Sequence, residues 1–136
     1  MRFRDADPVP PPVHAGEGEP IDYGAYARAI VTARARIGRH LDPSLFADPA
    51  FDILLDLLAS EQEGRKVNMS SCAHAARVAR TTGLRWVCTL EERGLVERVC
   101  DEADQRTTLV RLTAEARSSL INYLQQIARV PMLRLK

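Results

Sequence analysis

Two long stretches in the first half of the chain place apolar residues three and four positions apart, which is the spacing of one helix face. In residues 21–41 the apolar stripe consists of Tyr26, Ala29, Ile30, Ala33 and Ile37. In residues 42–64 it consists of Phe51, Leu54, Leu55 and Leu58. Asp48 followed by Pro49 is typical of a helix start, and Gly64 of a helix end. We therefore predict two helices, with Asp52 and Asp56 on an exposed side of the second.

Two shorter helices follow. Asn68 is suited to cap the first, and its small side chains, Cys72, Ala75 and Ala76, allow close helix contact. Thr81 or Thr82 is suited to cap the second, which is expected to end near Arg93 because Gly94 follows. The spacing of Gly83, Trp86, Val87 and Leu90 puts them on one face, so Trp86 is expected in the core.

After Gly94 the pattern changes from helical to alternating. Residues 95–100 and 107–113 read as two short strands, joined by a charged loop at 101–106. A last helix is expected from Thr113 to about Val130, before Pro131. The order predicts a mainly α protein with a small two- to three-stranded antiparallel β wing, the plan of a winged helix-turn-helix.

Residues 1–20 show no such periodicity. They are rich in proline, glycine and charge, and the run of prolines near residue 10 favours extended polyproline geometry. We therefore expect a flexible arm at 1–20 and a single winged-helix domain over 21–136.

Charge is distributed unevenly along the 136 residues, although 19 basic and 18 acidic side chains leave a net charge of only +1. Residues 42–63 carry six acidic side chains and no basic one, whereas residues 65–100 carry seven basic and three acidic ones. A near-neutral total therefore does not exclude a polyanionic partner. The three cysteines have no paired spacing, and no signal peptide or membrane span is recognisable, so we expect a cytoplasmic protein that makes no membrane contact.

The polar face of residues 80–93 is the candidate DNA-binding surface. Hydroxyls and backbone N–H groups near a helix start favour phosphate, and an arginine one turn further in has the reach and the fork geometry for a guanine edge. In the loop between the strands, Asp104 is suited to direct Arg106 into a minor groove. The predicted DNA-binding residues are Arg77, Arg80, Thr81, Thr82, Arg85, Thr89, Asp104 and Arg106.

Residues 81–113 resemble the recognition helix and wing of the MarR family of bacterial transcription regulators. The resemblance lies in Leu90-Glu91-Glu92-Arg93-Gly94-Leu95-Val96, and in Asp104 and Arg106 followed after five residues by Leu112-Thr113. It implies a homodimer paired through helices at 21–41 and 113–136, with two recognition helices in successive major grooves of a pseudo-palindromic duplex. The sequence departs from the family pattern at Gly83, where the family has a larger residue, and at Ala116, where it often has glycine.

Other functions stay open at this point. Cys88 lies on the predicted DNA-facing side, so a cysteine-based redox-responsive regulator is one alternative, and a winged-helix adaptor without DNA binding is another. The resemblance also leaves room for a small-molecule effector. An enzyme is not expected, because no nucleophile and base have suitable spacing, and neither a cofactor nor a metal is predicted.

Overall fold

The computed structural model describes residues 21–129. The predicted arm at 1–20 and the predicted end of the last helix beyond residue 129 lie outside this range. The elements are α1 (Tyr23–Ala35), the short 3-10 helices η1 (Arg36–Arg39) and η2 (Pro43–Phe46), α2 (Pro49–Glu63), α3 (Met69–Ala75), α4 (Arg80–Glu92), β1 (Val96–Cys100), β2 (Thr108–Leu112) and α5 (Ala114–Ile127). The predicted order of elements and the mainly α fold class are confirmed.

Most of the predicted helix ends are also confirmed. The side chains of Asp48, Asn68 and Thr113 each accept a hydrogen bond from a backbone N–H three residues ahead. Gly64 and Gly94 have φ angles of 70° and 75° and end α2 and α4 in the left-handed conformation that glycine adopts without strain.

The prediction that Thr81 or Thr82 caps α4 was wrong. The helix begins at Arg80, and its N-cap is Ala79, which provides no side-chain hydrogen bond. Because α3 ends at Ala75 and its C-cap is Ala76, only two residues separate the caps of α3 and α4, and α4 starts before the threonines. Both threonines therefore lie in the first turn, exposed to solvent.

Helix α2 is the centre of the core. It contacts α1, α3, α4 and β2, so eight of its residues are buried and they cover nearly the whole circumference of the helix. Asp52 and Asp56 are only 2% and 6% exposed, so their predicted exposed position was wrong. They can be buried because arginines from several elements pair with them.

The buried face of α1 also differs from the predicted stripe. Gly24, Tyr26 and Ala27 are buried, whereas Ala33 is exposed. The face turned towards α2 includes Arg28 and Arg34, whose guanidinium groups reach the two buried aspartates. The stripe failed because an apolar pattern cannot identify a face that contributes arginines to buried ion pairs.

Trp86 is not a core residue. Gly83, Val87 and Leu90 are buried as predicted, but Trp86 is 36% exposed at the edge of that face. Helix α4 lies so close to α3 that a Cβ at Gly83 would be 2.6 Å from the carbonyl oxygen of Ala73. This close approach explains the glycine at a position where the family pattern has a larger residue.

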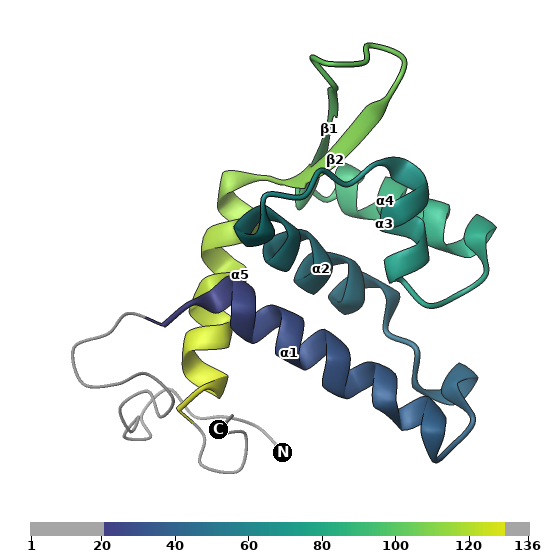
Figure 1. Ribbon diagram of the computed structural model, residues 1–136, viewed down its shortest axis with the longest axis vertical. Coiled ribbons are helices and arrows are strands. Elements are labelled where there is room, and N and C mark those ends of the chain that lie inside the picture. Colours follow the sequence, from purple (N-terminus) through teal and green to yellow (C-terminus); the bar gives the residue numbers. More distant parts are fainter. Residues whose placement is uncertain (1–20, 130–136) are drawn as a thin grey trace.

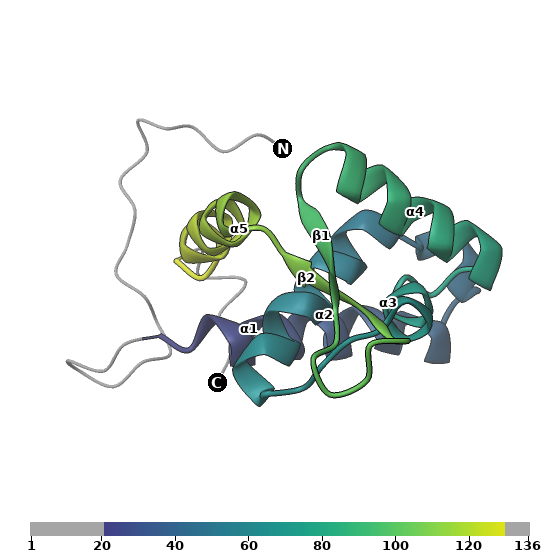
Figure 2. The ribbon, with the colours of Figure 1, turned by 90° about the horizontal axis from the view of Figure 1, so that it is seen from above.

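The wing is an antiparallel ribbon in which Val96 pairs with Leu112 and Cys100 with Thr108. One isolated bridge joins Asn68 to Leu109, so the segment before α3 adds a minimal third strand. Figure 1 shows the ribbon extending away from the helices, and Figure 2 shows α4 and α5 on opposite sides of it. None of the described helices is long and apolar enough to cross a membrane.

Candidate nucleic-acid interface

The exposed face of α4 carries Thr81, Thr82 and Arg85, as predicted. The Arg85 side chain makes no hydrogen bond or ion pair with any residue in the range 21–129. Thr89 lies one turn further along, half-buried, and its hydroxyl donates to the Arg85 carbonyl at 3.0 Å. A shallow depression on this face is lined by Thr81, Leu84, Arg85, Cys88, Thr89 and Glu92. Thus α4 presents an unpaired guanidinium and two hydroxyls to solvent.

The tip of the wing presents a second arginine. The side chain of Arg106 is 93% exposed, and Asp104 accepts hydrogen bonds from its backbone N–H at 3.1 Å and from its Nε at 3.3 Å. Asp104 also accepts from the Thr107 hydroxyl. The expected contact between Asp104 and Arg106 is therefore present. It holds the start of the side chain and leaves the guanidinium end in solvent.

The charged residues at the base of the wing are paired with one another. Arg98 forms an ion pair with Glu91 at 3.0 Å, and Arg111 forms one with Glu97 at 2.8 Å. Lys66 donates to Asp101 at 3.0 Å. The backbone N–H of Ala103 and the Lys66 ammonium lower the pKa of Asp101. These contacts hold the base of the ribbon. Arg106 at the tip is the most exposed basic side chain of the wing.

The two arginines that flank the start of α4 have different surroundings. Arg80 is exposed and donates only to the Ser70 hydroxyl, at 2.9 Å. Arg77 is instead directed inward, where its Nη2 and Nε donate to Asp52 at 3.0 and 3.3 Å. Its side chain is 28% exposed. The structure therefore places Arg80 with the predicted surface and Arg77 in a buried ion pair.

The acidic segment at 42–63 is largely occupied within the fold. Asp52, Asp56, Glu61 and Glu63 form ion pairs with arginines of α1, of α5 and of residues 65–77. Asp42 and Asp48 cap helices. An adaptor without DNA binding could use the acidic residues 42–63 as its interaction surface. Because these side chains already pair or cap helices within the fold, the segment offers no such surface of unpaired acids.

Three arginines of the basic stretch 65–100 have no acidic partner among the described residues. They are Arg80, Arg85 and Arg93, all exposed and all on α4 or at its end. The position of Arg93 next to the terminating glycine kept it out of the predicted site. Arginines without an acidic partner thus gather on α4 and its end, while Arg36, Arg39 and Arg129 lack one elsewhere in residues 21–129.

The cysteines differ in environment. Cys88 is half-buried on α4, and its sulfur lies 3.1 Å from the Nη2 of Arg98, which is its basic neighbour. Cys100 is exposed near the wing loop, and its Sγ lies 3.3 Å from the Gln105 carbonyl. Burial, with a smaller contribution from Asp56, raises the pKa of Cys72 to about 12. All three cysteines are free thiols.

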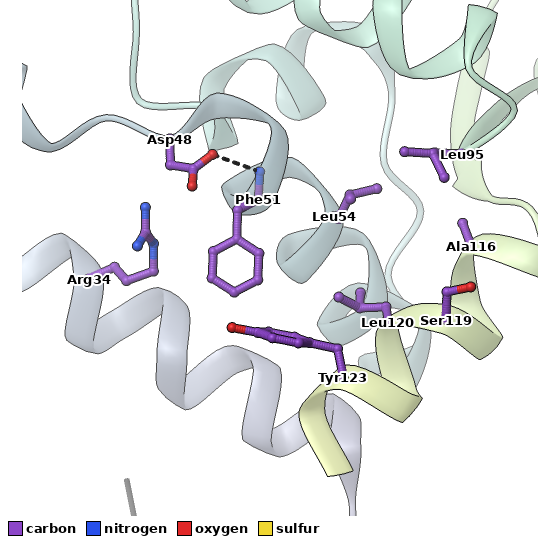
Figure 3. A pocket seen from close by; sticks show the side chains of 9 residues that line it. All are labelled: Arg34, Asp48, Phe51, Leu54, Leu95, Ala116, Ser119, Leu120 and Tyr123. Carbon is purple, nitrogen blue, oxygen red and sulfur yellow. Dashed lines mark hydrogen bonds between the residues drawn. The ribbon is translucent and has the colours of Figure 1, made fainter. Parts of the chain in front are cut away.

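An open hollow of about 510 Å³ lies between α1, α2 and α5, away from the exposed face of α4. Figure 3 shows the ring of Phe51 at its centre, with Arg34 on one side and Tyr123 on another. The Arg34 guanidinium lies 5.2 Å from the Phe51 ring centroid, and the Phe51 and Tyr123 rings meet edge to face at 6.0 Å. The sequence pattern gave no signal for this hollow, because its lining comes from three separate helices.

Comparison with protein families agrees with this geometry. Residues 54–116 match a family described as "Winged helix DNA-binding domain". The chain has a winged helix-turn-helix fold. The match extends from α2 to the start of α5, so it contains the exposed face of α4 and the whole wing. No curated protein sequence matches the chain significantly.

Several solved structures are similar to the chain. A MarR family transcriptional regulator from Silicibacter pomeroyi is 22% identical, with a TM-score of 0.48, over 72% of this chain and 63% of its own. MepR from S. aureus, in its DNA-binding conformation, is 19% identical with a TM-score of 0.49, over 76% of this chain and 74% of its own. A probable transcriptional regulator from Pseudomonas aeruginosa is 20% identical with a TM-score of 0.49, over 80% and 74%. The present chain therefore spans less than two thirds of the Silicibacter protein.

Proposed function

We propose that this protein is a MarR-like transcriptional regulator that binds specific double-stranded DNA as a homodimer in the cytoplasm of a bacterium. In each protomer α4 enters a major groove and Arg106 enters the adjacent minor groove. The observation that carries the proposal is the location of the unpaired positive charge. Three arginines without an acidic partner in residues 21–129, Arg80, Arg85 and Arg93, lie on α4 or at its end, and Arg106 at the wing tip is 93% exposed although it pairs with Asp104.

The roles of the individual groups follow from their chemistry. Arg85 can donate two parallel hydrogen bonds to a guanine edge, which supplies base preference. The exposed Thr81 and Thr82 hydroxyls and the Arg80 guanidinium suit phosphate oxygens, which fix the position of the helix but carry little sequence information. Thr89 has already used its hydroxyl hydrogen within the helix, so we expect it to accept rather than donate.

The dimer is supported by exposed apolar side chains outside α4. Among the described residues, Leu41, Leu45, Phe46 and Tyr123 are large, apolar and exposed. They lie on α5 or in the segment directly after α1, next to the regions 21–41 and 113–136 that we predict to pair. Pairing of two protomers would cover such surface, which monomers in water rarely leave exposed in large patches.

A small-molecule effector would have a place in the hollow between α1, α2 and α5. Its volume lies within the roughly 300–1,000 Å³ that is usual for ligand pockets, and its lining is largely apolar, with Arg34 at one side. We include the effector in the proposal on this ground. Thermal shift assays with a library of small aromatic and aliphatic acids would test it, and a Phe51→Ala variant that still folds should lose any response.

The DNA-binding proposal is tested by fluorescence anisotropy with duplexes selected from a random pool. Arg106→Ala should weaken binding to selected and shuffled duplexes alike and reduce the dependence of affinity on salt, because a groove and phosphate contact is lost. Arg85→Ala should weaken binding to the selected duplex by about tenfold and to the shuffled one much less, because a base contact is lost.

The matched control is Arg36→Ala, which removes the same charge from η1 at the C-terminal end of α1 (Figure 1). Because residues 21–41 are predicted to pair the protomers, size-exclusion chromatography first establishes that this variant has the oligomeric state of the wild type. It should bind like the wild type. Equal binding by the wild type, Arg85→Ala and Arg106→Ala would contradict the proposed interface. Absence of any salt-dependent DNA affinity in the wild type would favour the adaptor alternative.

A further inference from the structure

One buried carboxylate joins three parts of the protein. Asp52, in the first turn of α2, is 2% exposed, and each of its oxygens accepts from a different element. Its Oδ1 accepts from the Arg34 Nε of α1 at 2.7 Å, and its Oδ2 accepts from Arg77. A carboxylate buried this deeply requires such partners, so both arginines are held in place by it.

Arg77 lies in the turn between α3 and α4, and its backbone is unusual. Its φ angle is +55°, and it is the only residue other than glycine with a positive φ between residues 21 and 129. Glycine would adopt this conformation more easily, because a Cβ is disfavoured there. Glycine has no side chain, however, and so it could not form the ion pair that Arg77 makes with Asp52.

The direction of α4 is set by its buried face, which packs on α2, α3 and β1, and by the turn that leads into it. Only Arg77 and Val78 lie between the caps of α3 and α4, and the start of α4 has no side-chain cap. Gly83 sets how closely α4 approaches α3. The ion pair between Asp52 and Arg77 then ties the turn to the centre of the core. Through Arg34 the same carboxylate also holds α1.

We propose that Asp52 and Arg77 are positioning residues for the recognition helix, and that Arg77 acts on DNA through this buried ion pair and not by contacting phosphate. The inference rests on the proposed DNA-binding function. It assigns to Arg77 a role different from the direct DNA contact that the sequence predicts. Its consequence is that the two residues control base discrimination, although neither touches a base.

Asp52→Asn separates the two roles by the sign of its effect, because it keeps the shape of the side chain while removing the negative charge and replacing one acceptor oxygen with an NH2 donor. A phosphate-contacting Arg77 would be released by this change and would bind DNA more tightly. A positioning Arg77 would lose its anchor. We therefore expect about tenfold weaker binding to a duplex selected from a random pool, comparable to the loss of one base contact, and little change with a shuffled duplex of the same length.

Arg77→Gly provides the second variant and is compatible with the positive φ of the turn. The slope of log affinity against log salt should stay at the wild-type value, while discrimination between the two duplexes falls. A slope reduced by about 0.9 per lost phosphate contact would overturn the proposal. Arg80→Ala is the control that should show such a reduced slope. Tighter binding by Asp52→Asn, or unchanged discrimination by both variants, would also overturn it.

Hydrogen exchange tests the same inference without DNA. In Asp52→Asn, faster amide exchange should appear around Arg34 and in residues 76–87, which include the Gly83 N–H that donates to the Ala79 carbonyl in the first turn of α4. Faster exchange spread evenly over the core would show a merely structural ion pair and overturn the proposal. If the wild type binds no DNA, the proposed function fails by itself, and the exchange pattern still decides whether Asp52 positions α4.

Discussion

Arginine and cysteine side chains have opposite surroundings on the inner and outer sides of the helix-turn-helix. On the inner side Arg77 is bound by a buried carboxylate, and Cys72 is a buried thiol. On the outer side Arg85, eight residues later, has no partner among the described residues, and the Cys88 thiol is partly accessible. The contrast shows that a local excess of arginine does not by itself mark a DNA-binding surface. What distinguishes the proposed surface is that three arginines without an acidic partner in the described chain lie together on α4 or at its end, beside the wing.

Thiol chemistry sharpens this contrast with the largest expected effect. Because burial raises the pKa of Cys72 to about 12, it stays protonated at pH 8, and the thiolate is the reactive form. We expect iodoacetamide to modify Cys72 at least about 1,000-fold more slowly than an ordinary exposed cysteine, whose pKa is about 8.5. Peptide mass spectrometry would measure the rates, and denaturation in urea should make all three cysteines react alike. Rapid modification of Cys72 in the folded protein would contradict the inner environment described above.

Removing the buried carboxylate is the next largest change. Asp52→Ala leaves two arginines without their partner, and we expect the free energy of unfolding to fall by about 3 kcal/mol, at the lower end for buried pairs because both guanidinium groups keep some exposure. Urea denaturation followed by circular dichroism would measure the loss. The matched control is Asp104→Ala at the wing tip, which should cost less than about 1 kcal/mol because its pair is exposed. Similar losses of unfolding free energy for Asp52→Ala and Asp104→Ala would contradict the difference between the buried and the exposed ion pair.

A smaller effect is expected where α3 and α4 meet. Gly83→Ala would place a Cβ against the Ala73 carbonyl, so the two helices must move apart, at a cost of about 2 kcal/mol, a typical value for overpacking. The control is Gly38→Ala in the exposed η1, where the nearest atom is the Pro43 Cβ at 3.3 Å and the change should stay within about 0.5 kcal/mol. Thermal unfolding of both variants would test this. A neutral Gly83→Ala would show that the close approach is not required.

Much of the architecture could be predicted from the sequence. Asp48, Asn68 and Thr113 were identified as helix starts, or as the restart of a helix, because short polar side chains before an apolar run cap helices in a recognisable way. Gly64 and Gly94 were identified as helix ends for a similar local reason. The wing followed from the change of period after Gly94. Each of these features depends on residues that are close together in the sequence, so it can be recognised without knowing the fold.

The errors share one physical cause. Asp52 and Asp56 were assigned to an exposed side because charge is normally solvated, and Arg77 was assigned to phosphate for the same reason. Their burial depends on partners 9 to 28 positions away in the sequence, which no local pattern identifies. Some signal was present, because leucine and isoleucine surround both aspartates on all sides of α2, as in a fully buried helix. Trp86 was assigned to the core because its spacing matches that of Gly83, Val87 and Leu90. It lies instead at the edge of that buried face and is 36% exposed.

The central claim is that the outer face of α4 and the wing tip read DNA in a symmetric dimer. Selection of bound duplexes from a random pool by the full-length protein tests it most directly, with Arg85→Ala selected in parallel. We predict an enriched pseudo-palindrome whose half-sites lie about one helical turn apart, roughly 10 base pairs between centres, and loss of preference at one position in each half-site for Arg85→Ala. No enrichment, or a single unrepeated half-site that Arg85→Ala leaves unchanged, would contradict the account.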